Sequence, residues 1–313
     1  MIKHIDYFVP KERVSVETIF SEVNKENLPV FFETQEDGIS FFENILKLKE
    51  VSDAQSMTEF DLLDTLFQKN FNEKAINPLE VDLIILIDDA LKRGGRIPNL
   101  GQFMQYNYGF KNAEILVLSG NHCANIEYAI SYGELLLNSK EINSILIIGI
   151  NKMANYAERL IGNYAILGDG IGMVLLSSDV KNTGIKVNGS FSKTNGSFYK
   201  ADMETVPPII LYKNYMMCIA GLLKKDKLKP SVFSEVIIQN ANSSGIIECL
   251  KGLGFNSNQV NLDNNTKYGH LDCIDFVVNL KTILTQKVTP SSKILSFGNG
   301  YAGSNICLNL EVI

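Results

Sequence analysis

The stretch NHCANIEYAISYG (Asn121–Gly133) decides the fold, because it places a cysteine where a strand should end and a helix begin. Before it, AEILVLSG (113–120) has the composition of a buried strand, and after it SILIIGIN (144–151) has the same composition. Between them, apolar residues recur at helical spacing: Ile126, Ala129, Ile130, Gly133, Leu136 and Leu137. A strand, a helix and a second strand in this order predict a βαβ unit.

Short apolar runs of this kind recur along the whole chain. They are VDLIILID (81–88), AEILVLSG (113–120), INSILIIGIN (142–151), GIGMVLLSS (170–178), FSEVIIQNAN (233–242) and SKILSFGNG (292–300). All of them are rich in Ile, Val and Leu on both faces, as in buried strands. The alternation of such runs with helical segments predicts an α/β fold, with a parallel or mixed sheet and helices on both sides.

The pattern around Cys123 returns in the second part of the chain. After His270, apolar residues again fall at helical spacing, at Leu271, Ile274, Val277, Val278 and Leu284. Each predicted helix leads to a strand, a glycine-rich turn and a last strand. We therefore expect an internal duplication, with halves at residues 1–179 and 182–313. The polar segment KNTGIKVNGSFSKTNGSFYKADMETVPP (181–208) is interpreted as a linker or surface excursion.

Composition excludes several classes of protein. The 313 residues carry a formal net charge of -6 and no basic stripe, so a nucleic-acid partner is not expected. The start of the chain lacks a signal peptide and no run is long enough to span a bilayer, which predicts a cytoplasmic protein without a membrane partner. The five cysteines are widely spaced, which indicates neither a disulfide framework nor a metal site.

The glycine-rich segment GNGYAG (298–303) matches the dinucleotide fingerprint G-x-G-x-x-G. That fingerprint requires a helix directly after it, whereas SNICLNLEVI (304–313) has the composition of a strand. A tight turn between strands is the better interpretation.

Cys123 is a candidate nucleophile because of its place at a helix N-terminus. The unpaired N–H groups and partial positive charge there stabilise a thiolate, which is the reactive form. The same N–H groups can donate to an oxyanion when sulfur attacks a carbonyl. A cysteine just inside a helix is nevertheless more often a packing residue, and its position alone leaves both interpretations open.

A cysteine nucleophile needs an imidazole, and the chain has three: His4, His122 and His270. His4 is expected on the surface of an N-terminal strand, and His122 is expected to point away from its neighbour. This leaves His270, at the start of the equivalent helix in the second half, as the partner of Cys123. A polar strand end that includes Gln239 adds a further candidate, since open α/β sheets bind ligands at such ends.

Several segments together resemble the β-ketoacyl-acyl-carrier-protein synthase III group of thiolase-fold condensing enzymes. They are IDYFVPKERVSVETI, DLIILID with RIPNLGQFMQYNYG, LSGNHCANIEYA, LGDGIGMVLL, VIIQNANSSG, KYGHLDCIDF and LSFGNGYAGSNI, in this order. The resemblance implies a thiolase-like duplicated five-layer α-β-α-β-α fold and a homodimer. It also implies a cysteine, matched by Cys123, that takes an acyl group from acyl-CoA or an acyl-carrier protein, with no permanently bound cofactor.

The resemblance also assigns roles at the site, with departures. The family's other two catalytic groups are a histidine and an asparagine; here Gln239 stands at the histidine position and His270 at the asparagine position. Both kinds of side chain can donate hydrogen bonds. The oxyanion hole would combine the backbone N–H groups of Cys123 and Asn299. Ser243 and Ser244 stand where the family often has an arginine, and the chain lacks a tryptophan.

These features predict an acyltransferase that forms an S-acyl intermediate on Cys123. The acyl group would then pass to a malonyl-type carbon nucleophile, or to a hydroxyl or amine acceptor. Two alternatives stay open: a catalytically quiet partner subunit in a heterodimer with a related synthase, and a thioester hydrolase.

Overall fold

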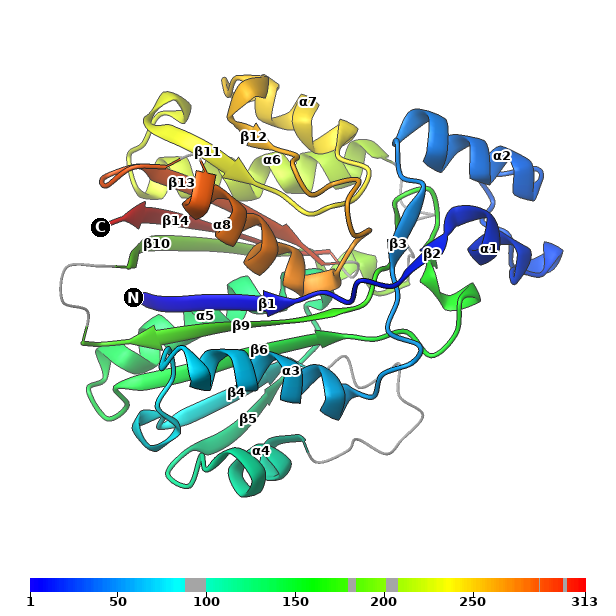
Figure 1. The fold of residues 1–313 in the computed structure, drawn as a ribbon. Helices are drawn as coiled ribbons and strands as arrows, with labels where there is room; N and C mark the ends of the chain where they lie inside the picture. The colour runs from blue at the N-terminus through cyan, green and yellow to red at the C-terminus, as the bar shows by residue number, and fades with distance from the viewer. Residues whose placement is uncertain (88–99, 180–183, 201–207, 287, 301–302) are drawn as a thin grey trace.

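The computed structural model describes residues 1–87, 100–179, 184–200, 208–286, 288–300 and 303–313 (Figure 1). Its large sheet is built from two sets of strands that follow one another in the sequence. The first set is β1 (Ile2–Phe8), β4 (Leu83–Ile87), β5 (Glu114–Leu118), β6 (Ser144–Asn151) and β9 (Gly170–Ser177). The second set is β10 (Ile185–Thr194), β11 (Phe233–Ile237), β12 (Val260–Asn261), β13 (Lys293–Asn299) and β14 (Ser304–Val312).

The two sets have the same topology. The strand order is β12-β11-β13-β14-β10-β1-β9-β6-β4-β5, so each set places its third, second, fourth, fifth and first strand from the outer edge inward. In each set the three strands nearest the outer edge are parallel to one another. The next strand inward, β9 or β14, is antiparallel to both of its neighbours. The sets meet where β1 pairs with β10 at Ile2 and Ile185. The expected duplication of the fold is confirmed.

Helices form three layers around the two sets of strands. Helices α3 (Glu59–Asn72) and α4 (Leu100–Tyr108) cover the outer face of the first set, and α6 (Pro208–Lys225) and α7 (Ser244–Gly252) cover the outer face of the second. Helices α5 (Asn125–Asn138) and α8 (Asp275–Gln286) pack between them and contact strands of both sets. The α-β-α-β-α arrangement that the resemblance implies is confirmed.

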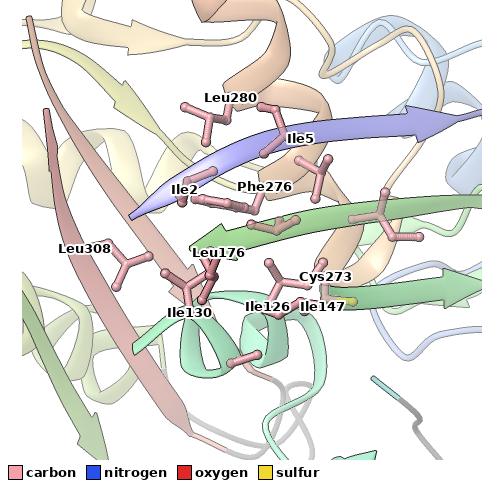
Figure 2. Close-up of a cluster of buried hydrophobic side chains, with 14 of the residues drawn as sticks. Ile2, Ile5, Ile126, Ile130, Ile147, Leu176, Cys273, Phe276, Leu280 and Leu308 are labelled. Carbon is pink, nitrogen blue, oxygen red and sulfur yellow. The ribbon is translucent and has the colours of Figure 1, made fainter. Parts of the chain in front are cut away.

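The central strands are apolar on both faces because each face meets a different core. Along β6, Ile145 and Ile147 point into the core around α5 and α8, while Leu146 and Ile148 point into the core under α3 and α4. Figure 2 shows the middle core, in which Ile126 and Ile130 of α5 lie near Ile147 and other residues of the strands. Each such side chain contributes about 1.5–3 kcal/mol when fully buried.

A smaller part lies beside the sheet (Figure 1). It comprises β2 (Arg13–Ser15), α1 (Val16–Ser21), α2 (Gln35–Ser40) with a π turn at Phe41–Ile45, and β3 (Glu50–Ser52), around its own cluster of phenylalanines. A short hairpin of β7 (Leu160–Ile161) and β8 (Ala165–Ile166) follows β6. One-turn helices occur at Lys25–Asn27, Pro78–Glu80, His122–Ala124, Ala157–Arg159, Gly196–Lys200, Pro230–Val232, Ser257–Gln259 and Asp272–Ile274.

The linker interpretation of residues 181–208 is wrong for most of that segment. Strand β10 occupies residues 185–194, between β14 and β1. Its Lys, Ser and Thr side chains are partly exposed, and a strand with an accessible face has a polar composition that resembles a loop. Residues 181–183 and 201–207 of the segment lie outside the described residues, as do 96–99 of RIPNLGQFMQYNYG, Asp88 of the first run and 301–302 of GNGYAG.

All six predicted strands are present, but β5 is not buried as expected. It is the edge strand next to β4, and Leu116 and Val117 are 45% and 48% exposed. Apolar residues on an edge strand are accessible unless another chain covers them. The glycine-rich segment at 298–303 leads into β14, as the turn interpretation requires. None of the described helices has both the length and the apolar character needed to cross a bilayer.

Candidate active site

Cys123 lies in a one-turn helix, η5 (His122–Ala124), that joins β5 to α5. His122, which precedes it, has a positive φ of 48°, and the Asn125 side chain caps the turn by accepting from the backbone N–H of Asn121. The thiol is nearly covered, at 8% exposure for the residue. The helix predicted from the sequence thus begins two residues after the cysteine.

The second half repeats this turn. The one-turn helix η10 (Asp272–Ile274) precedes α8, Asp272 has a positive φ of 57°, and Asp275 accepts from the backbone N–H of Leu271. Within the duplication, Cys273 therefore occupies the position that Cys123 has in the first half. This equivalence provides a matched control for the nucleophile.

The two turns meet in the middle layer and bring the predicted pair together. The Nε2 atom of His270 lies 3.1 Å from the Sγ atom of Cys123, although the residues are 147 positions apart in the sequence. His270 is fully buried. The predicted proximity of the thiol and the imidazole is observed, and the distance is short enough for proton transfer between them.

Asp275 forms a row of three side chains with His270 and Cys123, and it was not predicted from the sequence. Its Oδ2 atom lies 2.5 Å from Nδ1 of His270, and both side chains are fully buried. The carboxylate also accepts from the backbone N–H groups of Leu271 and Asn240 and from the Asn240 side chain. The available signal was its position in KYGHLDCIDF, where it matches the capping residue Asn125 of the first half.

Buried amides hold this carboxylate in place. The side chain of Asn279, one turn after Asp275 on α8, donates to the Asn240 side-chain oxygen at 3.0 Å and to the backbone oxygen of Ile238 at 2.9 Å. These bonds turn the Asn240 NH₂ group toward Asp275. Since buried polar groups are costly when unpaired, this network fixes the rotamers of both residues.

The backbone of His270 is fixed by the segment that precedes β9. Its N–H donates to the carbonyl of Ile166, and its own carbonyl accepts from the N–H of Gly168. A buried guanidinium supports this segment: Arg159 donates to the carbonyl of Leu167 and pairs with Asp169 at 2.7 Å. A second ion pair, with Asp53 at 2.8 Å, links the same guanidinium to the segment that follows β3.

Gln239 lies near the site, with both ends of its carboxamide hydrogen-bonded to other residues. Its Nε2 donates to the backbone oxygen of Asn299 at 2.9 Å, and its Oε1 accepts from the hydroxyl of Tyr164 at 3.0 Å. Tyr164, which the sequence reasoning also missed, sits edge-on to the His270 ring. Burial, followed by the neighbouring Tyr215 and Cys123, raises the pKa of Tyr164 well above its usual value, so the phenol stays neutral and can donate.

The end of β13 lies against the Cys123 turn. A Cβ atom placed on Gly300 would be 2.2 Å from the carbonyl oxygen of Asn121, so only glycine allows this approach. The adjacent residue, Asn299, is thereby close to the turn. The oxyanion hole formed by the N–H groups of Cys123 and Asn299 stays a prediction that this packing supports.

Two cavities flank the row. One, of about 180 Å³, has Tyr164, Gln239 and Asn299 in its wall, together with aromatic and hydroxyl side chains such as Tyr215 and Ser243. The other, of about 300 Å³, lies at the ends of β4 and β6 and reaches the two turns. Its wall includes Ile87, Asn125, Asn151, Lys152, Asp272 and Cys273. Both cavities thus lie against neighbours of the row, near the ends of parallel strands.

Glu127 is a buried carboxyl group one turn after the nucleophile. It is 2% exposed, its Oε1 lies 3.3 Å from the Ser296 hydroxyl, and in the described part of the chain its Oε2 has no hydrogen-bond partner. Burial, reinforced by the nearby Asp275, raises the pKa of Glu127 from 4.5 to about 8. The group is therefore neutral at pH 7.

Replacing Glu127 by glutamine should make stability less dependent on pH. A carboxyl whose pKa is raised on folding stabilises the native state fully below its unfolded pKa, and this contribution is lost as pH rises through the folded value. Between about pH 4.5 and pH 8, the free energy of unfolding of the wild type should therefore fall by on the order of 4 kcal/mol relative to that of Glu127→Gln. Urea unfolding of both proteins across this range measures the difference, and parallel curves would contradict the assignment.

Comparisons with known proteins agree with this architecture. No protein-family model matches the chain. The β-ketoacyl-[acyl-carrier-protein] synthase III of Clostridium perfringens (strain SM101 / Type A) is 27% identical over 262 residues, which are 74% of this chain and 77% of that protein.

Solved structures show the same fold. The 3-oxoacyl-[acyl-carrier-protein] synthase III from Aquifex aeolicus VF5 has a TM-score of 0.78 and 20% identity, with 99% of each chain covered. A cysteine-to-serine form of Xanthomonas campestris OleA, solved with bound lauric acid and lauroyl-CoA, has a TM-score of 0.81 and 12% identity, and the match covers 99% of this chain and 98% of that one. The sequence relatives and the thiolase-type fold together show that this chain is similar to the β-ketoacyl-[acyl-carrier-protein] synthase III proteins, and this likeness supports an enzyme of the acyl-transferring class.

Proposed function

We propose that the protein transfers an acyl group from a thioester of coenzyme A or of an acyl-carrier protein through an S-acyl intermediate on Cys123. The observation that carries the proposal is the buried row in which Asp275 contacts Nδ1 of His270 and Nε2 of His270 contacts the Cys123 sulfur. A nucleophile, a base and a group that orients the base are the parts that covalent acyl transfer requires.

In the first half-reaction His270 takes the thiol proton and the thiolate of Cys123 attacks the thioester carbonyl. The oxyanion that forms would be held by the backbone N–H groups of Cys123 and Asn299. When the tetrahedral intermediate collapses, the C–S bond to the donor breaks and the imidazolium protonates the departing thiolate. The proton that leaves the donor with its thiolate thus comes from the Cys123 thiol through His270, and the step needs no permanently bound cofactor.

The proposal is tested by mass spectrometry of the intact protein after incubation with acyl-CoA and acyl-carrier-protein substrates of increasing chain length. We expect one added acyl group, which peptide mapping places on Cys123. Failure of every donor to acylate the folded protein would favour the alternative of a catalytically quiet partner subunit. Rapid release of free acid without an acceptor would favour the thioester hydrolase.

We further propose that the protein forms a homodimer through the edge strand β5. Leu116 and Val117 lie exposed on this strand, whose free edge can pair with a second copy. A heterodimer with a related synthase would use the same edge.

Substitution of Val117 by lysine should convert the dimer to a monomer, because the change places a charge in the centre of the proposed interface. Light scattering coupled to gel filtration measures the mass. Ile209→Lys, on the exposed face of α6, is a control of similar character that should leave the dimer intact. A wild-type protein of monomer mass, or a Val117→Lys dimer, would contradict the proposed interface.

A further inference from the structure

The geometry of the imidazole indicates which kind of acceptor removes the acyl group. Resting on the function proposed above, we infer that S-acyl-Cys123 is consumed by a hydroxyl or amino compound that His270 deprotonates. The competing reaction, attack by the carbanion of a decarboxylating malonyl thioester, is disfavoured by the same geometry.

The contacts of Asp275 fix the position of the imidazole proton. Asp275 accepts hydrogen bonds from the backbone N–H groups of Leu271 and Asn240 and from the Asn240 NH₂ group. The Oδ2 atom of this carboxylate lies 2.5 Å from Nδ1 of His270 and accepts from it as well. The proton of the neutral ring is therefore on Nδ1, and the lone pair of Nε2 faces the sulfur of Cys123.

In the acyl-enzyme, the state of Nε2 of His270 decides which acceptor the imidazole can serve. After acylation the thiol proton has left with the donor thiol, so Nε2 of His270 again carries a lone pair at the acyl group. A lone pair accepts a proton from an incoming O–H or N–H bond, which is general base catalysis. It cannot donate a hydrogen bond to the enolate oxygen that a malonyl thioester develops when it loses carbon dioxide.

Gln239 is the other candidate donor toward an enolate. The carboxamide of Gln239 gives one N–H to the Asn299 backbone, and its oxygen is held by the Tyr164 hydroxyl. This arrangement makes Gln239 part of the cavity wall and restricts its rotation toward an enolate. The wall combines apolar side chains with hydrogen-bonding groups such as Asn242 and Ser243, which can bind the hydroxyl or amino group of an acceptor.

The second half-reaction then balances as follows. His270 removes the proton of the acceptor O–H or N–H group, and the oxygen or nitrogen attacks the acyl carbonyl. A C–O or C–N bond forms and the C–S bond to Cys123 breaks. The proton on Nε2 returns to the Cys123 thiolate, which restores the thiol and the neutral imidazole. Asp275 acts through His270 and is a positioning residue.

The experiment separates the two half-reactions. The protein is first acylated with butyryl-N-acetylcysteamine, and the adduct on Cys123 is measured by mass spectrometry. The isolated acyl-enzyme is then mixed with hydroxylamine, with ethanolamine or with malonyl-N-acetylcysteamine, and loss of the adduct and the product are followed. The same acyl-enzyme unfolded in urea gives the uncatalysed rate. We expect hydroxylamine and ethanolamine to remove the acyl group from the folded protein faster, and malonyl-N-acetylcysteamine to give no ketoacyl product.

The isosteric variant Asp275→Asn tests the role of the base. Transfer to ethanolamine should fall by about 10²–10⁴-fold, because the ring loses its orienting acceptor and the preferred tautomer changes. The pH profile of transfer, corrected for the rate from the acyl-enzyme unfolded in urea, should differ in shape between the wild type and the variant. A role in folding alone would lower the amount of active protein without changing the shape of the pH profile.

The outcomes are distinct. A ketoacyl product with release of carbon dioxide would overturn the inference while leaving the S-acyl intermediate intact. Removal of the acyl group by hydroxylamine and ethanolamine no faster than from the unfolded control would also overturn it, as would hydrolysis by water alone. Absence of the adduct in the first step would instead refute the proposed function.

Discussion

Replacing Cys123 by alanine is expected to abolish the acyl adduct and to lower turnover by a factor on the order of 10⁴ or more. The sulfur is the atom that lies 3.1 Å from the His270 base, and alanine offers no substitute nucleophile. The change removes one atom from a nearly covered position, so the fold should persist. Intact-protein mass spectrometry and steady-state turnover measure the two effects.

The matched control is Cys273→Ala. Cys273 holds the equivalent position in the second half and is also buried, so its removal imposes a similar packing change. Acylation should be unchanged in this variant. An adduct that persists in Cys123→Ala and disappears in Cys273→Ala would contradict the assignment, because it would place the acyl group on Cys273.

Replacing Arg159 by alanine should destabilise the protein by about 3–5 kcal/mol, because the substitution leaves the buried carboxylate of Asp169 without its cation. The second ion pair, with Asp53, is lost as well. Urea unfolding of the variant and the wild type measures the effect. A surface control is Lys251→Ala, which breaks an exposed pair with Glu248 and should cost at most about 1 kcal/mol.

The Arg159 variant should also acylate more slowly under conditions where it is folded. The guanidinium holds the carbonyl of Leu167, and the next residue, Gly168, donates to the His270 carbonyl. Loosening of this segment lets the imidazole move away from the sulfur. Equal stability of Arg159→Ala and Lys251→Ala, or an acylation rate equal to that of the wild type, would show that the cluster does not support the site.

The strands could be predicted from the sequence because their signal is local. Runs such as SILIIGIN are apolar on both faces, and this composition reports two covering layers whatever the rest of the chain does. The two errors, at β10 and β5, have the same origin: the composition of a strand does not report its place in the sheet. Strand β10 is polar because one face is accessible, and β5 is apolar although it lies exposed at an edge of the sheet. The division of the chain at residues 179 and 182 stays a prediction, which the repeated strand order supports.

The site was only partly accessible from sequence. A single thiol at a strand-to-helix junction and a shortage of histidines sufficed to pair Cys123 with His270. The roles of Gln239 and Asn299 depend on the resemblance and stay predictions. Asp275 was not selected among the 35 acidic residues, because its burial depends on distant segments and its match to Asn125 in the repeated turn was the one available signal.

The sequence by itself determined the alternation of strands and helices, the duplication of the fold and the two residues that meet at its centre, because hydrophobic periodicity and residue chemistry are written along the chain. Only the tertiary structure decided that Asp275 orients the imidazole, that Asn240 and Asn279 hold Asp275, and that Gln239 is bound to the cavity wall. These contacts join segments that are distant in sequence or lie on different elements. Their geometry is set by how the two sets of strands pack against the middle helices.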